Sequence, residues 1–205
     1  MGKVICDITV SLDGFIAGPN ARPGNPLGDG GERLHHWMYP LESWREPQGL
    51  KGGRTNEDSA VVEESTTRAG AFVMGRRMFD EGEEPWGDTP PFRRPVFIVT
   101  HDAHDTIVKD GGTTYTFVTD GIERAVELAK AAAGDLDVAI SGGANVVQQL
   151  IKAGVLDELQ IHLAPILLGG GVRLFDNLGD VGVEFEGTRV IASPRVTHLQ
   201  FRLVR

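Results

Sequence analysis

Cysteine is almost missing from this chain of 205 residues, since Cys6 is the only one. No disulfide can therefore form within the chain, and the scattered histidines have no cysteine partners for a zinc site, so we expect no metal. No run of 18 apolar residues occurs, which leaves no candidate membrane span. Asp7 interrupts the apolar core that a signal peptide would need, so we expect a cytoplasmic protein without a membrane partner.

Positive charge is also scarce, because 20 Lys and Arg residues face 29 Asp and Glu residues. A net charge of −9 repels a phosphate backbone, so we expect no nucleic-acid partner. The G-x-G-x-x-G fingerprint, the P-loop and the G-x-S-x-G elbow of serine hydrolases are all absent. Glycine, in contrast, is abundant, with 27 residues clustered between hydrophobic runs.

Hydrophobic patterning predicts strands that alternate with helices along the chain. The strands are expected at 4–17, 69–74, 95–100, 114–118, 137–140 and 159–168. Helices are expected at 57–68, after Gly75, at 120–133 with Asp120 as N-cap, and at 144–153. Residues 81–94 read as a polar, proline-rich loop, and 183–191 and 196–204 as a hairpin. This order predicts one α/β domain over 1–205, with a mostly parallel mixed sheet between helical layers and a C-terminal antiparallel hairpin.

Residues 18–56 have a different composition, with five prolines, eight glycines and neither valine nor isoleucine. A loop of this length in a compact domain is usually functional or disordered. The segment also holds Trp37, Tyr39 and Trp44, which disordered linkers seldom keep. We therefore predict an ordered lid or pocket wall with a short helix around 32–38; a floppy insertion is the alternative.

The strongest local motif is a strand followed by two glycines and a helix, at Ser141-Gly142-Gly143. Glycines let the backbone approach a ligand closely, and the first N–H groups of the next helix attract an anion such as pyrophosphate. Simple packing of the strand against the helix is the other explanation.

Two further strand ends carry groups that suit phosphate or hydroxyl ligands. Arg76 and Arg77 follow Gly75, and an arginine fork donates paired hydrogen bonds to phosphate. Pairing with the acidic residues at 81, 83 and 84 would explain these arginines without a ligand. Thr100 and His101 end the strand at 95–100. Because ligands gather at the carboxyl ends of parallel strands, one dinucleotide would account for all three ends together.

Four motifs in order carry a resemblance to a known family: residues 11–17 (SLDGFIA), 75–77 (GRR), 141–143 (SGG) and 165–169 (PILLG). The chain resembles the dihydrofolate-reductase-like family typified by the C-terminal reductase domain of the riboflavin-biosynthesis deaminase–reductase. The resemblance implies that fold, a homodimer, and NADPH-dependent reduction of a C=N or C=O bond in a heterocyclic or sugar-linked small molecule, as in 5-amino-6-(5-phosphoribosylamino)uracil reductase. The zinc motif of the deaminase is absent.

The resemblance also implies positions for the parts of NADPH. Gly75, Arg76 and Arg77 match the motif for the 2′-phosphate, and Thr100 and His101 the strand end beside the adenine ribose. The pyrophosphate turn corresponds to Ser141, Gly142, Gly143, Ala144, Asn145 and Val146, and the strand end beside the nicotinamide to Ile16 and Ala17.

The proton donor is less well defined. Dihydrofolate reductases use a carboxylate on the helix before the Gly-Arg strand, where this chain offers Glu57, Asp58, Glu63 and Glu64. Asp58 is closest in spacing, and Asp13 is the other candidate, unless it only stabilises its turn. His162 and His198 lie within strands and are expected to be structural. Trp37, Trp44 and Trp86 are candidates for the substrate wall. Dihydrofolate as substrate, or NADP binding without catalysis, are the alternatives.

Overall fold

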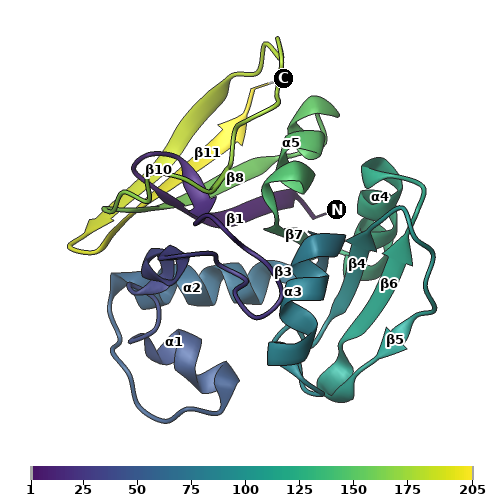
Figure 1. The fold of residues 1–205 in the computed structure, drawn as a ribbon, viewed down its shortest axis with the longest axis horizontal. Helices are drawn as coiled ribbons and strands as arrows, with labels where there is room; N and C mark the ends of the chain where they lie inside the picture. The colour runs from purple at the N-terminus through teal and green to yellow at the C-terminus, as the bar shows by residue number, and fades with distance from the viewer. Residues whose placement is uncertain (1, 205) are drawn as a thin grey trace.

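The computed structural model describes residues 2–204 and has a nine-stranded sheet at its centre (Figure 1). The strand order is β10-β11-β8-β1-β7-β3-β4-β6-β5. The six strands from β8 to β6 run parallel, whereas β5, β10 and β11 pair antiparallel. The strands are β1 (Val4–Ser11), β3 (Ala69–Gly75), β4 (Pro95–Val99), β5 (Ile107–Val108), β6 (Thr114–Val118), β7 (Asp137–Gly142), β8 (Glu158–Ala164), β10 (Phe185–Ser193) and β11 (Val196–Leu203). The predicted mixed sheet and its C-terminal hairpin are confirmed.

Helices cover both faces of this sheet. They are α1 (Glu42–Arg45), α2 (Glu57–Arg68), α3 (Arg76–Trp86), α4 (Ile122–Ala133) and α5 (Ala144–Lys152), with short 3-10 helices η1 (Gly31–His35), η2 (Glu46–Gln48) and η3 (Asp110–Gly112). Alternate residues of β3 show the layering, because Val73 packs with α4 and α5 while Met74 packs with Phe79 of α3. None of the helices within 2–204 is long and apolar enough to cross a membrane.

The first predicted strand is two strands, because the turn at 11–14 breaks it. Residues after the turn form β2 (Phe15–Ala17), which pairs with β9 (Val172–Arg173) in a separate two-stranded sheet. The expected strand at 159–168 ends at Ala164, directly before Pro165.

Two helix boundaries differ from the prediction for local reasons. The helix expected to start with Asp120 as N-cap starts one residue later, because Gly121 takes the cap position with a φ of 90° and no side chain caps the helix. The capping box belongs instead to α2, where Asn56 and Ser59 exchange hydrogen bonds. Residues 81–86 are not loop but the end of α3, with the Trp86 ring packed over Gly82 and 4.9 Å from Phe92.

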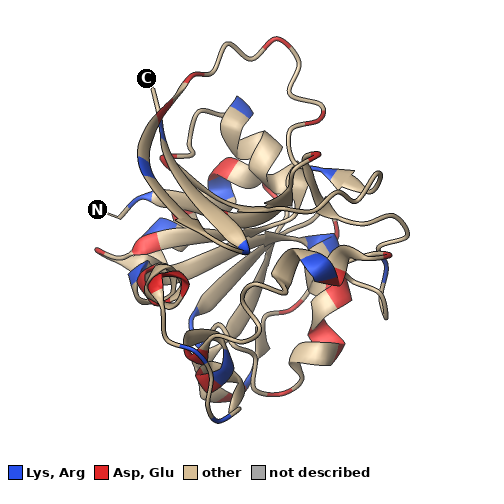
Figure 2. Ribbon diagram, turned by 90° about the vertical axis from the view of Figure 1, so that its left-hand side faces the viewer, with Lys and Arg blue, Asp and Glu red and all other residues tan. Residues whose placement is uncertain are grey.

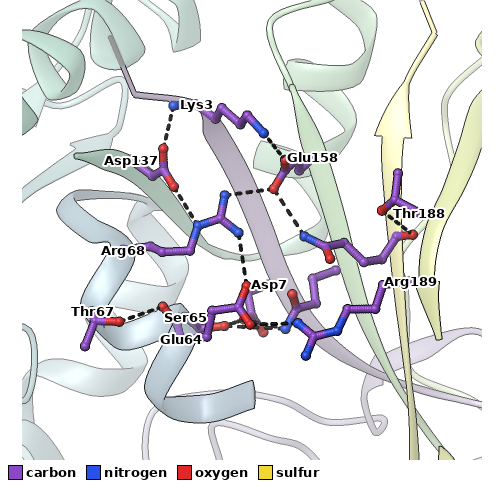
Figure 3. Close-up of polar contacts among 12 residues, drawn as sticks. Lys3, Asp7, Glu64, Ser65, Thr67, Arg68, Asp137, Glu158, Thr188 and Arg189 are labelled. Atoms are coloured by element: carbon purple, nitrogen blue, oxygen red, sulfur yellow. Dashed lines mark hydrogen bonds and ion pairs between the residues drawn. The ribbon is translucent and has the colours of Figure 1, made fainter. Parts of the chain in front are cut away.

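Ion pairs attach the last turn of α2 to the amino ends of the parallel strands (Figure 3). Arg68 donates to Asp137 of β7 at 2.8 Å and to Glu158 of β8 at 2.9 Å. The Lys3 ammonium lies 2.5 Å from the other Glu158 oxygen, and its backbone N–H donates to Asp137. This network fixes α2 across one face of the sheet, which positions the first turn of α2 beside β11.

Residues 18–56 fold over the same face as α2. Trp37 and Leu41 are almost fully buried, and both pack against Val196 of β11 in a small hydrophobic cluster. Backbone bonds between Pro40 and Arg54 and between Glu42 and Arg54 close the second half of the segment. The short helix expected around 32–38 is η1, a 3-10 helix. Aromatic side chains of the segment therefore lie against the sheet.

Candidate active site

The three strand ends singled out in the sequence lie next to one another. β7, β3 and β4 are neighbours and parallel, so their carboxyl ends share one edge of the sheet (Figure 1). Met74 pairs with Gly142, and Gly75 pairs with Val99. A Cβ atom placed on Gly75 would be 3.9 Å from the backbone nitrogen of Gly143. A ligand at this edge would therefore meet residues from all three strands.

Two helices begin at this edge without a side-chain cap. α3 starts after Gly75 and α5 starts after Gly143, so their first N–H groups have no partner within the helix. No heavy atom lies within 4 Å of a Cβ position built on Gly143, which leaves open space for a ligand. Gly142 has a φ of +108°, and the Gly142–Gly143 peptide bond is cis. Both helix starts offer a binding place for an anion.

The two arginines at the start of α3 are followed by acidic residues on the same helix (Figure 2). Arg76 forms an ion pair with Asp80 at 2.6 Å, and Arg77 with Glu81 at 3.2 Å. Of the acidic partners that the sequence offered, Glu81 pairs with Arg77, whereas Arg76 pairs with Asp80 instead. Arg76 also contacts the ring nitrogen Nε2 of His104 at 2.6 Å, so its guanidinium lies between α3 and the loop after β4.

The remaining residues expected near the cofactor differ in what they expose. Thr100 is buried and its hydroxyl accepts a hydrogen bond from Asp102 N–H, whereas His101 is exposed. Ala144 and Val146 point into the core, so only their backbone faces the strand ends. Asn145 is exposed and its side chain bonds to Gln149. Ile16 and Ala17 lie on β2, which contacts β1.

A pocket of about 420 Å³ adjoins this edge and runs under α2 and residues 35–48. Ser141 belongs to both the pocket lining and the glycine turn, so the two regions meet there. The aromatic part of the lining comprises His35, Trp37, Trp44, Phe72, Phe92 and His162, and the polar part includes Asp7, Thr9, Ser65, Ser141 and Gln160. Trp37 and Trp44 line this pocket, whereas Trp86 does not. Such an apolar pocket with a few convergent polar groups is typical of small-molecule sites.

Buried nitrogen atoms without a partner also mark this pocket. His35 Nδ1 and Trp37 Nε1 make no hydrogen bond to any described residue, although both are shielded from solvent. Burial lowers the pKa of His35 to about 4, with the neighbouring His162 adding to the effect, so this ring is neutral near pH 7. Buried polar atoms normally have partners, so a bound molecule is a natural source of them.

Charge along the pocket is mostly negative. Arg68 is the one arginine or lysine among its described lining residues, and both Asp137 and Glu158 already neutralise it. The carboxylates among the lining residues are Asp7 on β1 and Asp137 on β7. A phosphate group inside the pocket would therefore meet no unpaired cation from these residues.

The two carboxylates predicted as proton donors do not line the pocket. Asp13 accepts hydrogen bonds from the Ser11 hydroxyl and from the backbone of Leu168 and Gly169, which lower its pKa to about 2. A carboxyl group with that pKa holds no proton near pH 7, so its contacts are those of a residue that fixes the turn. Asp58 is buried behind the pocket and accepts from Asn56 while contacting His198.

His162 and His198 were expected from the sequence to be structural, yet His162 lines the pocket and contacts His198. His162 Nε2 is 2.5 Å from Asp7 Oδ1, and His162 Nδ1 is 2.6 Å from His198 Nδ1. Burial favours the neutral form of Asp7, but the charge and hydrogen bond of His162 outweigh it and lower the pKa of Asp7. The alternation of side chains along each strand was the available sequence signal, because it indicates which face of the sheet each residue occupies. Which of these residues meet depends on the strand order, which the alternation does not specify.

The architecture is that of the dihydrofolate-reductase-like class. Dihydrofolate reductase from Enterococcus faecalis, in complex with NADP(H), superposes with a TM-score of 0.53 at 13% identity, covering 98% of this chain and 96% of that one. Residues 2–199 match the family described as the RibD C-terminal domain, so the chain belongs to that family.

Two relatives show how far the likeness extends. A crystal structure from Shewanella sp. PV-4, provisionally described as a riboflavin biosynthesis protein, has a TM-score of 0.70 and 24% identity, with 100% of both chains covered. The riboflavin biosynthesis protein RibD of Bacillus amyloliquefaciens is 34% identical over 113 residues. That match covers 52% of this chain and only 28% of the RibD protein. The resemblance seen in the sequence is confirmed.

Proposed function

We propose that this chain is an NADPH-dependent reductase that adds a hydride to a C=N or C=O bond of a heterocyclic or sugar-linked compound. The observation that supports this most is the contact, at Ser141, between a three-strand anion site and an open, largely aromatic pocket. An extended cofactor and a flat substrate would meet at that point. Membership of the RibD C-terminal domain family supports an oxidoreductase.

The residues at the strand ends fit NADPH chemically. The open space beside Gly143 and the uncapped start of α5 suit the pyrophosphate, for which we assign residues 141–146. Arg76 and Arg77 at the start of α3 would hold the 2′-phosphate, with Gly75 allowing close approach. Thr100 and His101 would lie beside the adenine ribose, and Ile16 and Ala17 beside the nicotinamide. When bound, the reduced nicotinamide supplies the hydride.

Two substrates follow from different observations. The family relationship favours 5-amino-6-(5-phosphoribosylamino)uracil, the substrate class of the RibD reductase. The lining of the pocket favours dihydrofolate, because Asp7 offers a carboxylate to ring N–H groups while Arg68 is already paired. The assay therefore includes both compounds and the dephosphorylated form of the uracil substrate.

The test combines binding with turnover. We expect NADPH to raise the melting temperature clearly more than NADH does, and NADPH absorbance to fall with time when the correct substrate is present. Equal and negligible shifts with both nucleotides would contradict the proposal. Tight NADPH binding without oxidation across the substrate panel would instead establish a nucleotide-binding protein without catalysis.

A further inference from the structure

Four titratable side chains form an unbroken series of contacts between the pocket and the first turn of α2. The series runs from Asp7 on β1 to His162 on β8, His198 on β11 and Asp58 on α2, with distances of 2.5, 2.6 and 3.0 Å. We call it the Asp–His–His–Asp chain. Four different elements supply its members, so the fold assembles it.

The sheet register brings the histidines face to face. His162 and His198 are direct partners in the antiparallel pairing of β8 with β11. Trp37 covers both rings, with centroid distances of 5.0 and 5.2 Å, and each histidine is about 5% exposed or less. Water is therefore kept from the middle of the Asp–His–His–Asp chain, where the Nδ1 atoms of the two histidines face each other.

Counting protons shows what this arrangement requires. Three hydrogen bonds need three protons, but two ionised aspartates and two neutral imidazoles hold only two. A third proton must be shared, and the four groups together then carry a charge of about −1 wherever it resides. Burial, together with the neighbouring His162, lowers the pKa of His198, so the extra proton is disfavoured on the His198 ring. Moving all three protons by one hop each transfers this proton from one end to the other without breaking the chain.

The two ends of the Asp–His–His–Asp chain have different surroundings. Asp7 and His162 line the pocket of about 420 Å³, and the Asp7 side chain is 26% exposed. Asp7 also accepts a hydrogen bond from the Ser65 hydroxyl, which holds its carboxylate in place. His198 instead borders a separate hollow of about 10 Å³, beside Arg189, with room for about one water molecule. Both ring nitrogens of His198 are already bonded, to His162 and to Asp58, so the series of contacts meets water at its Asp7 end.

We propose that the Asp7 carboxylate relays to the substrate the proton that it shares with His162, and that His198 and Asp58 are positioning residues that hold this shared proton in place. The proposal rests on the proposed reductase function. The hydride adds to the carbon of the C=N or C=O bond, and the π electron pair moves to the nitrogen or oxygen. That atom takes the proton from Asp7, so the product carries one new C–H and one new N–H or O–H bond. After the product leaves, water in the open pocket restores the third proton through the partly exposed Asp7 carboxylate.

Removing the donor affects the chemical step more than cofactor binding. We expect Asp7→Asn to lower kcat by about 10²- to 10⁴-fold, the usual contribution of general acid catalysis, while the Kd for NADPH stays within about twofold. The matched control is His36→Asn, which changes an exposed histidine outside the pocket lining and leaves both constants unchanged. A kcat for Asp7→Asn equal to that of the wild type overturns the donor assignment.

The positioning role has its own signature. Asp58→Asn keeps an oxygen acceptor for His198 but removes the negative charge that stabilises the shared proton. The Asp–His–His–Asp chain then loses its shared proton at a lower pH than in the wild type. The alkaline limb of the kcat profile therefore moves to lower pH. The other titratable or charged groups facing the chain are His35 of η1, Glu64 of α2 and Arg189 of β10, and none changes in this variant. An unchanged limb would reduce Asp58 to a structural residue and overturn this part of the proposal.

A spectroscopic measurement separates this proposal from the proposed function. In wild-type protein labelled with ¹⁵N-histidine, we expect a proton resonance shared between two Nδ1 atoms, which persists in His36→Asn and disappears in His198→Gln. If the folded wild-type protein lacks this resonance, the proposed Asp–His–His–Asp chain is overturned even when the enzyme is active. Presence of the resonance without NADPH binding or turnover would instead refute the proposed function, and the donor role with it.

Discussion

Replacing Arg76 by alanine tests the assignment of the 2′-phosphate to the start of α3. The Arg76 guanidinium lies at the end of β3, where it contacts Asp80 and His104. NADPH and NADH differ only in that phosphate group. The variant should therefore weaken NADPH binding selectively, whereas loss of a purely structural residue would weaken both nucleotides.

The expected size follows from the present contacts of Arg76. A charge-assisted hydrogen bond to phosphate contributes roughly 1.5–3 kcal/mol. The existing pair with Asp80 is partly exposed, with side-chain exposures of 32% and 42%, so giving it up costs about 0–1 kcal/mol. The net loss of about 0.5–3 kcal/mol corresponds to a rise of roughly 2- to 150-fold in the Kd for NADPH. The Kd for NADH should change by less than about twofold.

Fluorescence titration of the tryptophans with each nucleotide measures both constants. Arg124→Ala is the matched control, because Arg124 also forms a surface pair on a helix, with Glu127 at 2.7 Å, but lies on α4. A Kd ratio of NADPH to NADH that is the same in Arg76→Ala and in the wild type would refute the assignment. Equal weakening of both nucleotides would refute it as well.

Three further variants or reagents test the scaffold around the site. Arg68→Met leaves Asp137 and Glu158 without their shared cation and should destabilise the protein by about 2–3 kcal/mol at pH 7, measured by urea unfolding. Burial opposes ionisation of Glu158, but the hydrogen bonds and charges of Lys3 and Arg68 lower its pKa, so their contribution is present above the unfolded pKa and is lost as pH falls through the folded one. The destabilisation by Arg68→Met should therefore shrink in acid, and a constant difference down to pH 3 would contradict this account. Burial raises the pKa of Cys6 far above its usual range, so a thiol reagent should label native protein only as fast as it unfolds; rapid labelling would show that β1 is accessible. Gly142→Ala should cost about 1–2 kcal/mol from its positive φ alone, since its nearest neighbours leave room for a methyl group, and an unchanged melting temperature would show that the turn adapts.

Local sequence patterns were sufficient for the order of strands and helices and for the common edge of the three strand ends. The glycine turn at 142–143 and the arginines after Gly75 each stand directly behind a short apolar strand, and parallel strands must end on the same side. Helix boundaries were less predictable where tertiary contacts compete with local signals. Pro85 suggests a loop, yet packing of Trp86 over Gly82 keeps α3 helical there.

The Asp–His–His–Asp chain could not be predicted because its members are distant in sequence. His162 and His198 meet only because β11 returns beside β8, a pairing that no local pattern specifies. Asp58 was selected from its spacing, but the contact it makes depends on how α2 crosses the sheet. Isolated histidines within strands are usually structural, so the sequence favoured that interpretation.

A crystal structure with NADPH bound tests the central claim most directly. The account predicts one continuous ligand along the ends of β4, β3 and β7, with its 2′-phosphate beside Arg76 and Arg77 and its nicotinamide at the mouth of the pocket near Ser141. A ligand bound on another face, or strand ends without density at saturating NADPH, would contradict it.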